Sequence, residues 1–174
     1  MPLTFGQRVF KWVPLALLIV VLALGAAATR AEGGNAGGEQ RGRPLLPAKS
    51  NAAWQEECSG CHIAYAPGLL GAASWRKIMS GLDQHFGVDA SLPAASNTEI
   101  TAFLTQHASQ RWSAKTAPLR ITESGWFRSA HNPREVNPAV FKRASIKSSS
   151  NCGACHSQAD QGRFDERAIR IPAQ

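Results

Sequence analysis

Methionine, tyrosine and cysteine are scarce in this chain of 174 residues, which contains two, one and four of them respectively. Met1 is the initiator, so Met79 is the only methionine left for a role in the folded protein. Aromatic residues make up only 7% of the chain, and five of them are tryptophans. Such a sparse set does not indicate a sheet-rich core. The length allows one domain or two small ones.

The chain also lacks any basic block interleaved with aromatic residues, which is the pattern of a nucleic-acid-binding surface. Its formal net charge is +7, but Arg8, Lys11 and Arg30 lie in an N-terminal segment with the features of an export signal. Without these three, 16 basic residues stand against 12 acidic ones, a net charge of +4. We therefore do not expect nucleic acid as a partner, and we expect a solvated surface with at most a docking patch.

The chain has no cysteine outside two copies of Cys-x-x-Cys-His, which are Cys58-Ser59-Gly60-Cys61-His62 and Cys152-Gly153-Ala154-Cys155-His156. Two residues between the cysteines let one turn of backbone present both sulfurs to the two vinyl groups at one edge of a haem. The histidine that follows is then carried under the ring, where it binds iron as the proximal ligand. We therefore predict two covalently bound haem c groups. The attachment residues would be Cys58, Cys61, Cys152 and Cys155, with His62 and His156 as proximal ligands.

Two other uses of the four cysteines stay open at this point. One zinc ion bound by all four would leave the two histidines without a role, and zinc sites of this kind favour a reducing compartment. Two disulfides in an exported protein would also leave the histidines unexplained. Covalent haem accounts for all six residues and is the stronger interpretation.

Residues 1–31 are predicted to be a signal peptide. A charged start is followed by an apolar run of sixteen residues, 13–28, and then by small residues suited to cleavage. The run is short for a membrane span and contains Pro14, so we expect cleavage and a periplasmic protein. An uncleaved leader, which would tether the chain to the membrane, is the minor alternative. The glycine-rich residues 32–50 are predicted to be a flexible linker.

Helical periodicity and capping residues predict four helices in two haem c domains, residues 51–115 and 116–174. The first helix follows a cap at Ser50 or Asn51 and delivers Cys58, Cys61 and His62 at its end. The others are predicted over 74–86, with Ser74 as cap, from a capping box at 96–99 to His107, and over 123–131. Residues 112–122 and 138–150 are predicted connections, and the tail 163–172 could form one helical turn that wraps the second haem.

Both irons need a distal ligand or remain open. Met79 could serve at most one of them, and it lies on the apolar stripe of its helix, where packing is its ordinary role. His85 and His107 both fall on inward-facing positions near the first haem sequence, and His131 precedes the second. The residues alone thus favour two histidines at each iron and leave His107 as a rival to His85.

Several segments besides the two Cys-x-x-Cys-His sequences carry a family pattern: Tyr65-Ala66-Pro67-Gly68-Leu69-Leu70, Gly81 with His85-Phe86-Gly87, Trp126-Phe127 with His131, and Ile169-Arg170-Ile171-Pro172. Over residues 54–172 the chain resembles the dihaem cytochromes c of the bacterial periplasm that accompany the monohaem, oxygen-binding sphaeroides haem protein. The resemblance implies that His62 pairs with His85 and His156 with His131, and it gives His107 no ligand position.

The resemblance also implies a mainly α fold. An N-terminal part like a small helical cytochrome c would be followed by a C-terminal part with little regular structure. The implied role is to pass electrons from a membrane cytochrome b towards a soluble monohaem protein that binds oxygen or nitric oxide.

A six-coordinate haem has no vacant site for substrate, so we expect an electron carrier and not an enzyme. Histidine in place of methionine as the distal ligand lowers the reduction potential. The main alternative is a peroxidase-like enzyme or a gas-binding protein with one open iron, but the histidines outnumber the distal positions that need filling. A structural haem in an assembly or sensory subunit is a weaker interpretation.

Overall fold

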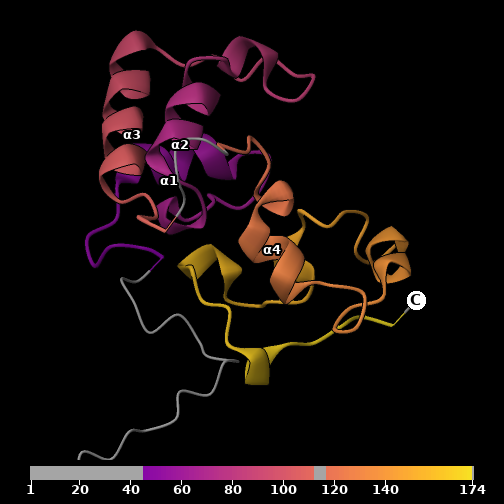
Figure 1. Cartoon of the computed structure of the whole chain (residues 1–174). Helices are drawn as coiled ribbons and strands as arrows, with labels where there is room; N and C mark the ends of the chain where they lie inside the picture. The colour runs from indigo at the N-terminus through magenta and orange to yellow at the C-terminus, as the bar shows by residue number, and fades with distance from the viewer. Residues whose placement is uncertain (1–44, 112–116, 174) are drawn as a thin grey trace, which may run out of the picture. The chain divides into compact units, whose positions relative to one another are not determined.

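The structure is a computed structural model that describes residues 45–111 and 117–173 (Figure 1). The predicted leader, most of the predicted linker and residues 112–116 of the predicted connection lie outside these ranges. Within them the chain forms helices and turns but no β-strand, so the prediction of a mainly α fold is confirmed. The α-helices are α1 Ala52–Ser59, α2 Ala72–Met79, α3 Ala94–Gln106 and α4 Gly125–Ala130. None of the described helices is long and apolar enough to cross a membrane.

Helix α1 begins where the capping pattern predicts. The side-chain oxygen of Asn51 accepts a hydrogen bond from the backbone N–H of Trp54 at 2.7 Å, which satisfies one of the unpaired donors of the first turn. The indole of Trp54 is buried and lies 5.3 Å, centroid to centroid, from the ring of Phe103 in α3. Cys58 therefore sits in the last turn of a helix that is anchored in the core.

The main hydrophobic core lies among α1, α2 and α3, which Figure 1 shows side by side. Ile100, Phe103 and Leu104 supply the face of α3, as its periodicity predicts. In α2, Trp75 donates its indole N–H to the carbonyl of Pro67, at 2.7 Å, in the short 3₁₀ helix η2 Pro67–Leu69. This core packs the loop between the first haem sequence and α2 against the helices.

The predicted helix 74–86 is wrong in its bounds. Helix α2 starts after Gly71, so Ser74 lies inside the helix, buried, and does not cap it. The helix ends at Met79, and a separate 3₁₀ turn, η3 Leu82–Gln84, follows Gly81. Leu82 is still buried, because the 3₁₀ turn directs its side chain into the core. The apolar spacing of the sequence therefore continues past the end of α2, and for this reason it suggested one continuous helix.

The predicted capping box of the third helix is also wrong. Helix α3 begins at Ala94, directly after Pro93, so Ser96 lies in the first turn instead of at the cap. The carboxylate of Glu99 accepts a hydrogen bond from the side-chain amide of Asn51 at 2.6 Å, which ties the start of α1 to α3. Glu99 therefore forms a tertiary contact between α1 and α3 instead of the capping hydrogen bond that the local pattern predicts.

The C-terminal half contains one α-helix and a series of 3₁₀ turns. Helix α4 is shorter than the predicted 123–131: the hydroxyl of Ser124 caps it by accepting from the N–H of Phe127 at 3.1 Å, and His131 follows its last residue. The turns are η5 Ile121–Glu123, η6 Pro138–Lys142, η7 Cys152–Ala154, η8 Ala159–Gln161 and η9 Glu166–Ala168. The single turn η9 agrees with the short helical turn expected in the tail.

Two glycines are required where Leu45 and Leu46 approach other segments. A Cβ at Gly68 would lie 2.8 Å from the Cα of Leu45, closer than two carbon atoms can pack. Gly162 has a positive φ of 67°, and a Cβ there would lie 3.0 Å from the side chain of Leu46. Leu46 also packs against the main core, so this residue contacts both the first half of the chain and the turn after η8.

Candidate functional site

The first histidine pair consists of His62, which follows α1, and His85, which follows η3. Their ring centroids lie 6.2 Å apart, with 31° between the ring planes. The Nδ1–H of His62 donates to the carbonyl of Ile63 at 2.7 Å, which leaves Nε2 as the nitrogen with a free lone pair. The ring of Tyr65 stacks on His62 at 4.7 Å, so the imidazole is held in its orientation from one side.

The second pair consists of His131, at the end of α4, and His156, in the second cysteine sequence. Their centroids lie 6.1 Å apart, and the ring planes are 75° apart. The Nδ1–H of His131 points to the carbonyl of Phe127 at 3.2 Å, and the ring of Phe127 stacks on the imidazole at 4.1 Å. The ring of Phe164, from the tail, packs against His156 at 5.2 Å. As in the first pair, backbone and aromatic contacts fix the orientation of the imidazole rings.

The separation within both pairs fits two imidazoles on opposite sides of one metal ion. A metal–imidazole bond is about 2 Å long and the ring centroid lies roughly 1 Å beyond the bonded nitrogen, so two trans ligands have centroids about 6 Å apart. Direct hydrogen bonding or ring stacking between the histidines would bring them closer. Nδ1 of His156 is buried without a hydrogen-bond partner, unlike the Nδ1 atoms of His62 and His131, which point to backbone carbonyls.

Burial affects the titration of these histidines. It lowers the pKa of His131, and it lowers that of His156 with a further contribution from His131. The pKa of His85 is lowered by burial first, then by the charges of His62 and Arg120. Lowered pKa values keep the rings neutral at neutral pH, and the neutral imidazole is the form that binds metal.

In the sequence each pair of cysteines directly precedes one of these histidines, and the four cysteines are not joined to one another. Burial raises the pKa of Cys58 and of Cys152 to about 11, so both thiols are protonated and uncharged at neutral pH. Among the described residues no group of three or more His, Cys, Asp or Glu side chains is arranged to hold a metal ion. Each histidine pair has a Cys-x-x-Cys sequence directly before one of its members, and these residue types fit a covalently bound haem.

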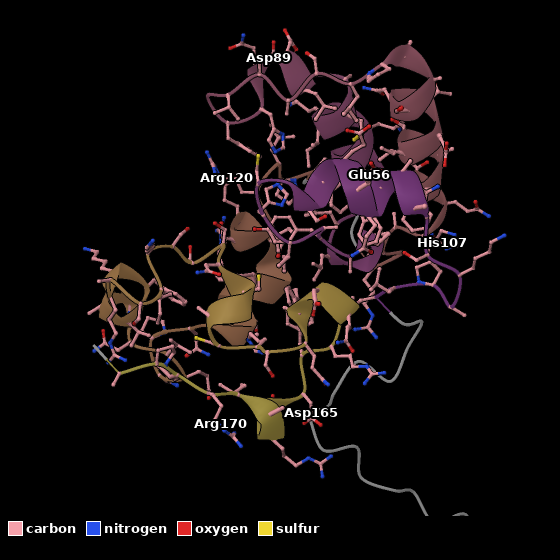
Figure 2. All side chains as sticks on the ribbon, turned by 180° about the vertical axis from the view of Figure 1, so that it is seen from behind. Glu56, Asp89, His107, Arg120, Asp165 and Arg170 are labelled. Atoms are coloured by element: carbon pink, nitrogen blue, oxygen red, sulfur yellow. The ribbon has the colours of Figure 1, made fainter. Side chains whose placement is uncertain are left out.

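His107 is not brought to either pair. It caps the C-terminal end of α3, where Figure 2 labels it, and its ring lies 5.2 Å from that of Phe103 in the same helix. Met79 is buried in the main core, as its position on the apolar stripe predicts. The geometry thus favours His85 over both rivals as the residue that faces His62.

Two long-range contacts at the site were not predicted from the sequence. The Tyr65 hydroxyl donates to the carbonyl of Ser150, at 2.7 Å, two residues before Cys152. The guanidinium carbon of Arg120 lies 4.1 Å from the centroid of the Phe86 ring, next to His85. Tyr65 is the single tyrosine of the chain and belongs to the family pattern 65–70, but neither feature indicates its partner; the sequence around Arg120 offers no signal at all.

Comparisons with known proteins identify the family of the chain. A family model described as Dihaem cytochrome c matches residues 54–164. The chain is similar to the crystal structure of DHC purified from Rhodobacter sphaeroides, with 41% identity over 67% of this chain and 98% of that chain and a TM-score of 0.59. The diheme cytochrome type c from Shewanella baltica is 37% identical over 70% of this chain and 93% of that chain, with a TM-score of 0.62. No curated protein matches the chain.

The match covers well over half of the chain, and the chain therefore belongs to the dihaem cytochrome c family. It carries two covalently attached haem c groups and is a haem-based electron carrier. Covalent haem attachment thereby replaces the zinc and disulfide interpretations of the cysteines.

Proposed function

We propose that the chain is a periplasmic electron-transfer protein whose two irons are each closed by two histidines. Cys58 and Cys61 attach the first haem, with His62 and His85 as axial ligands. Cys152 and Cys155 attach the second, with His156 and His131. Bound haem supplies one-electron exchange between the ferric and ferrous states of iron.

One observation carries this proposal: both histidine pairs have the spacing of trans ligands on a single metal ion. If both axial positions are filled by the chain, no substrate or gas reaches either iron. Two imidazoles, in contrast to a histidine and a methionine, favour the ferric state and a low reduction potential. These properties suit a carrier and disfavour a peroxidase.

Electron exchange between the two sites has a continuous route through the chain. The Tyr65 ring stacks on His62, and its hydroxyl donates to the Ser150 carbonyl. The same carbonyl accepts from the backbone N–H of Cys152 at 3.0 Å. The route thus connects an axial ligand of the first haem with an attachment residue of the second by stacking and hydrogen bonds.

The proposal includes export and partners. The N-terminal apolar segment would direct the chain to the periplasm, where c-type haem is attached, and would then be removed. The electron donor would be a membrane cytochrome b, and the acceptor a soluble monohaem protein. Mass spectrometry of the exported protein should give a chain shortened near residue 31 with two haems retained after acid-acetone extraction.

The decisive test is optical. Ferric and ferrous protein at neutral pH should show low-spin spectra that carbon monoxide barely changes. Myoglobin, with its open ferrous iron, is a suitable positive control for the gas. Rapid binding of one equivalent of carbon monoxide per chain would show an open iron. The protein would then be a gas-binding protein or a peroxidase and not an electron carrier with two closed irons.

A further inference from the structure

The turn that carries His85 has an unusual backbone. Phe86 has a positive φ of 50°, which a residue with a side chain adopts only at a cost in energy, and Gly87 follows with φ of 100°. The turn is closed by a hydrogen bond from the N–H of Val88 to the carbonyl of His85, at 3.1 Å. A strained conformation of this kind persists only where other contacts hold it in place.

The Phe86 ring supplies such a contact, although it is 46% exposed to solvent. It packs edge to face with the His85 imidazole, with 4.8 Å between the ring centroids and 60° between the ring planes. The Arg120 guanidinium lies over the ring at 4.1 Å, within the range of a cation–π interaction. Phe86 is therefore packed between the distal histidine of the first pair and an arginine from the other half of the chain.

Arg120 is itself held in place. The next residue, Ile121, packs against the main core. The carboxylate oxygen Oε1 of Glu123, in η5, lies 3.9 Å from Nε of Arg120. The arginine thus reaches back from the segment that precedes α4 to the turn that carries His85.

We propose that Arg120 is a positioning residue for the first haem: by packing on Phe86 it keeps the His85 imidazole facing His62. The inference rests on the proposed function, because it takes His85 as an axial ligand. It adds that closure of the first iron depends on Arg120, a residue of the C-terminal half, while closure of the second iron does not depend on Arg120.

The test measures how fast each distal histidine leaves its iron. Excess cyanide replaces the distal imidazole in the ferric protein, so the rate of cyanide binding reports the opening of each site. The two haems are followed separately by electron paramagnetic resonance, because their imidazole planes meet at different angles, 31° and 75°. Arg120→Gln should speed cyanide binding at the first haem roughly two- to fivefold, because that factor corresponds to the free energy of an exposed cation–π contact. The rate of cyanide binding at the second haem should not change.

Matched variants separate this role from a general effect of charge or stability. Arg128→Gln removes an exposed arginine from α4 and should leave the rate of cyanide binding at the first haem unchanged. Arg120→Lys keeps a cation over the ring and should restore most of the wild-type rate. Phe86→Leu keeps the backbone cost and the apolar bulk but removes the ring face; Arg120→Gln should then have no further effect in that background.

The inference is overturned if Arg120→Gln leaves the rate at the first haem unchanged, alters both haems equally, or adds its full effect to that of Phe86→Leu. A failure of the proposed function is distinguishable from these results. If the wild-type protein itself binds carbon monoxide, or if His85→Ala leaves the first haem low-spin, the ligand assignment fails independently of any Arg120 variant.

Discussion

The four paired histidines differ in what their Nδ1 atoms contact. Those of His62 and His131 point to backbone carbonyls, which can only accept, so both nitrogens carry the proton. A hydrogen bond of this kind fixes the tautomer and makes the opposite nitrogen a better metal ligand. Nδ1 of His156 has no partner, so this ring is oriented mainly by its covalent neighbours and by Phe164. One histidine of each pair is therefore firmly oriented by the backbone.

Substitution of the distal histidines should open the two haems one at a time. His85→Ala removes the residue that faces His62, and His131→Ala the one that faces His156, so each variant should bind about one equivalent of carbon monoxide per chain and turn one haem high-spin. His107→Ala is the matched control and should leave both haems low-spin, because His107 packs on Phe103. A high-spin signal from His107→Ala, with none from His85→Ala, would contradict the assignment of the first pair.

The angles between the imidazole planes predict two different ferric signals. At 31° the two rings of the first pair act on the iron orbitals in nearly the same direction and should give a rhombic low-spin spectrum. At 75° the effects of the second pair largely cancel, and one very large g value is expected. Electron paramagnetic resonance of frozen ferric protein measures both.

The same His→Ala variants assign these signals. His85→Ala should remove the rhombic signal and His131→Ala the one with the large g value. Two identical rhombic signals in the wild-type protein would show that the ring planes of the second pair are not crossed.

At the scale of secondary structure, α4 is too short to be stable alone, since isolated helices of this length do not form in water. It depends on its Ser124 cap, whose hydroxyl is buried and accepts from the N–H of Phe127. The same helix carries Phe127, which stacks on His131. The cap therefore supports His131, the proposed distal ligand of the second haem, through one turn of helix.

Ser124→Ala should lower the free energy of unfolding by about 1 kcal/mol and increase cyanide access at the second haem only. Asn51→Ala is the matched variant: it removes the cap of α1 and the hydrogen bond to Glu99, with a similar loss of stability, but contacts nothing in the second pair. Guanidinium unfolding gives the stability change. If both variants opened the same haem, ligand access would follow overall stability and not the local cap.

The helices show which features the sequence could predict. Local signals located α1, narrowed its cap to Ser50 or Asn51, of which Asn51 is the cap, and located the apolar face of α3, because these features depend on neighbours within one or two turns. The break after Met79 was missed, since the 3₁₀ turn η3 keeps Leu82 buried and so continues the helical pattern. His85 was expected to point inward from a helix, whereas a strained turn places it opposite His62.

The contacts that join the two halves could not be predicted. Tyr65 and Ser150 are 85 residues apart, and no periodic pattern connects positions at that separation. The packing of Arg120 on Phe86 accompanies the packing of Ile121 on the core of α1, α2 and α3, which lies earlier in the chain. The haem sequences were recognisable because their chemistry is confined to five consecutive residues, while the histidine that faces each of them is brought there by tertiary structure.

At the scale of the whole chain, buried apolar residues are unevenly divided. Ten of them form the main core cluster, from Trp54 to Ala108. The described residues from 117 onward contribute four buried hydrophobic residues, Phe127, Val140, Ile146 and Ala159. So small a set offsets little of the conformational entropy lost on folding. The second haem must therefore supply much of the apolar surface around which the C-terminal half is ordered.

Loss of each haem should consequently have unequal effects. The double variant Cys152→Ser/Cys155→Ser, which cannot attach the second haem, should lose protection from hydrogen exchange over most of residues 117–173. The main core should stay protected, because its contacts among α1, α2 and α3 do not involve the second haem. The matched variant Cys58→Ser/Cys61→Ser should weaken protection in the first half but retain it at Ile100 and Leu104, the most deeply buried positions of α3. Hydrogen exchange with mass spectrometry measures both variants in the full chain. Persistent protection of residues 117–173 without the second haem would mean that the backbone hydrogen bonds there, such as that from Arg170 to the carbonyl of Cys155, suffice to order this half.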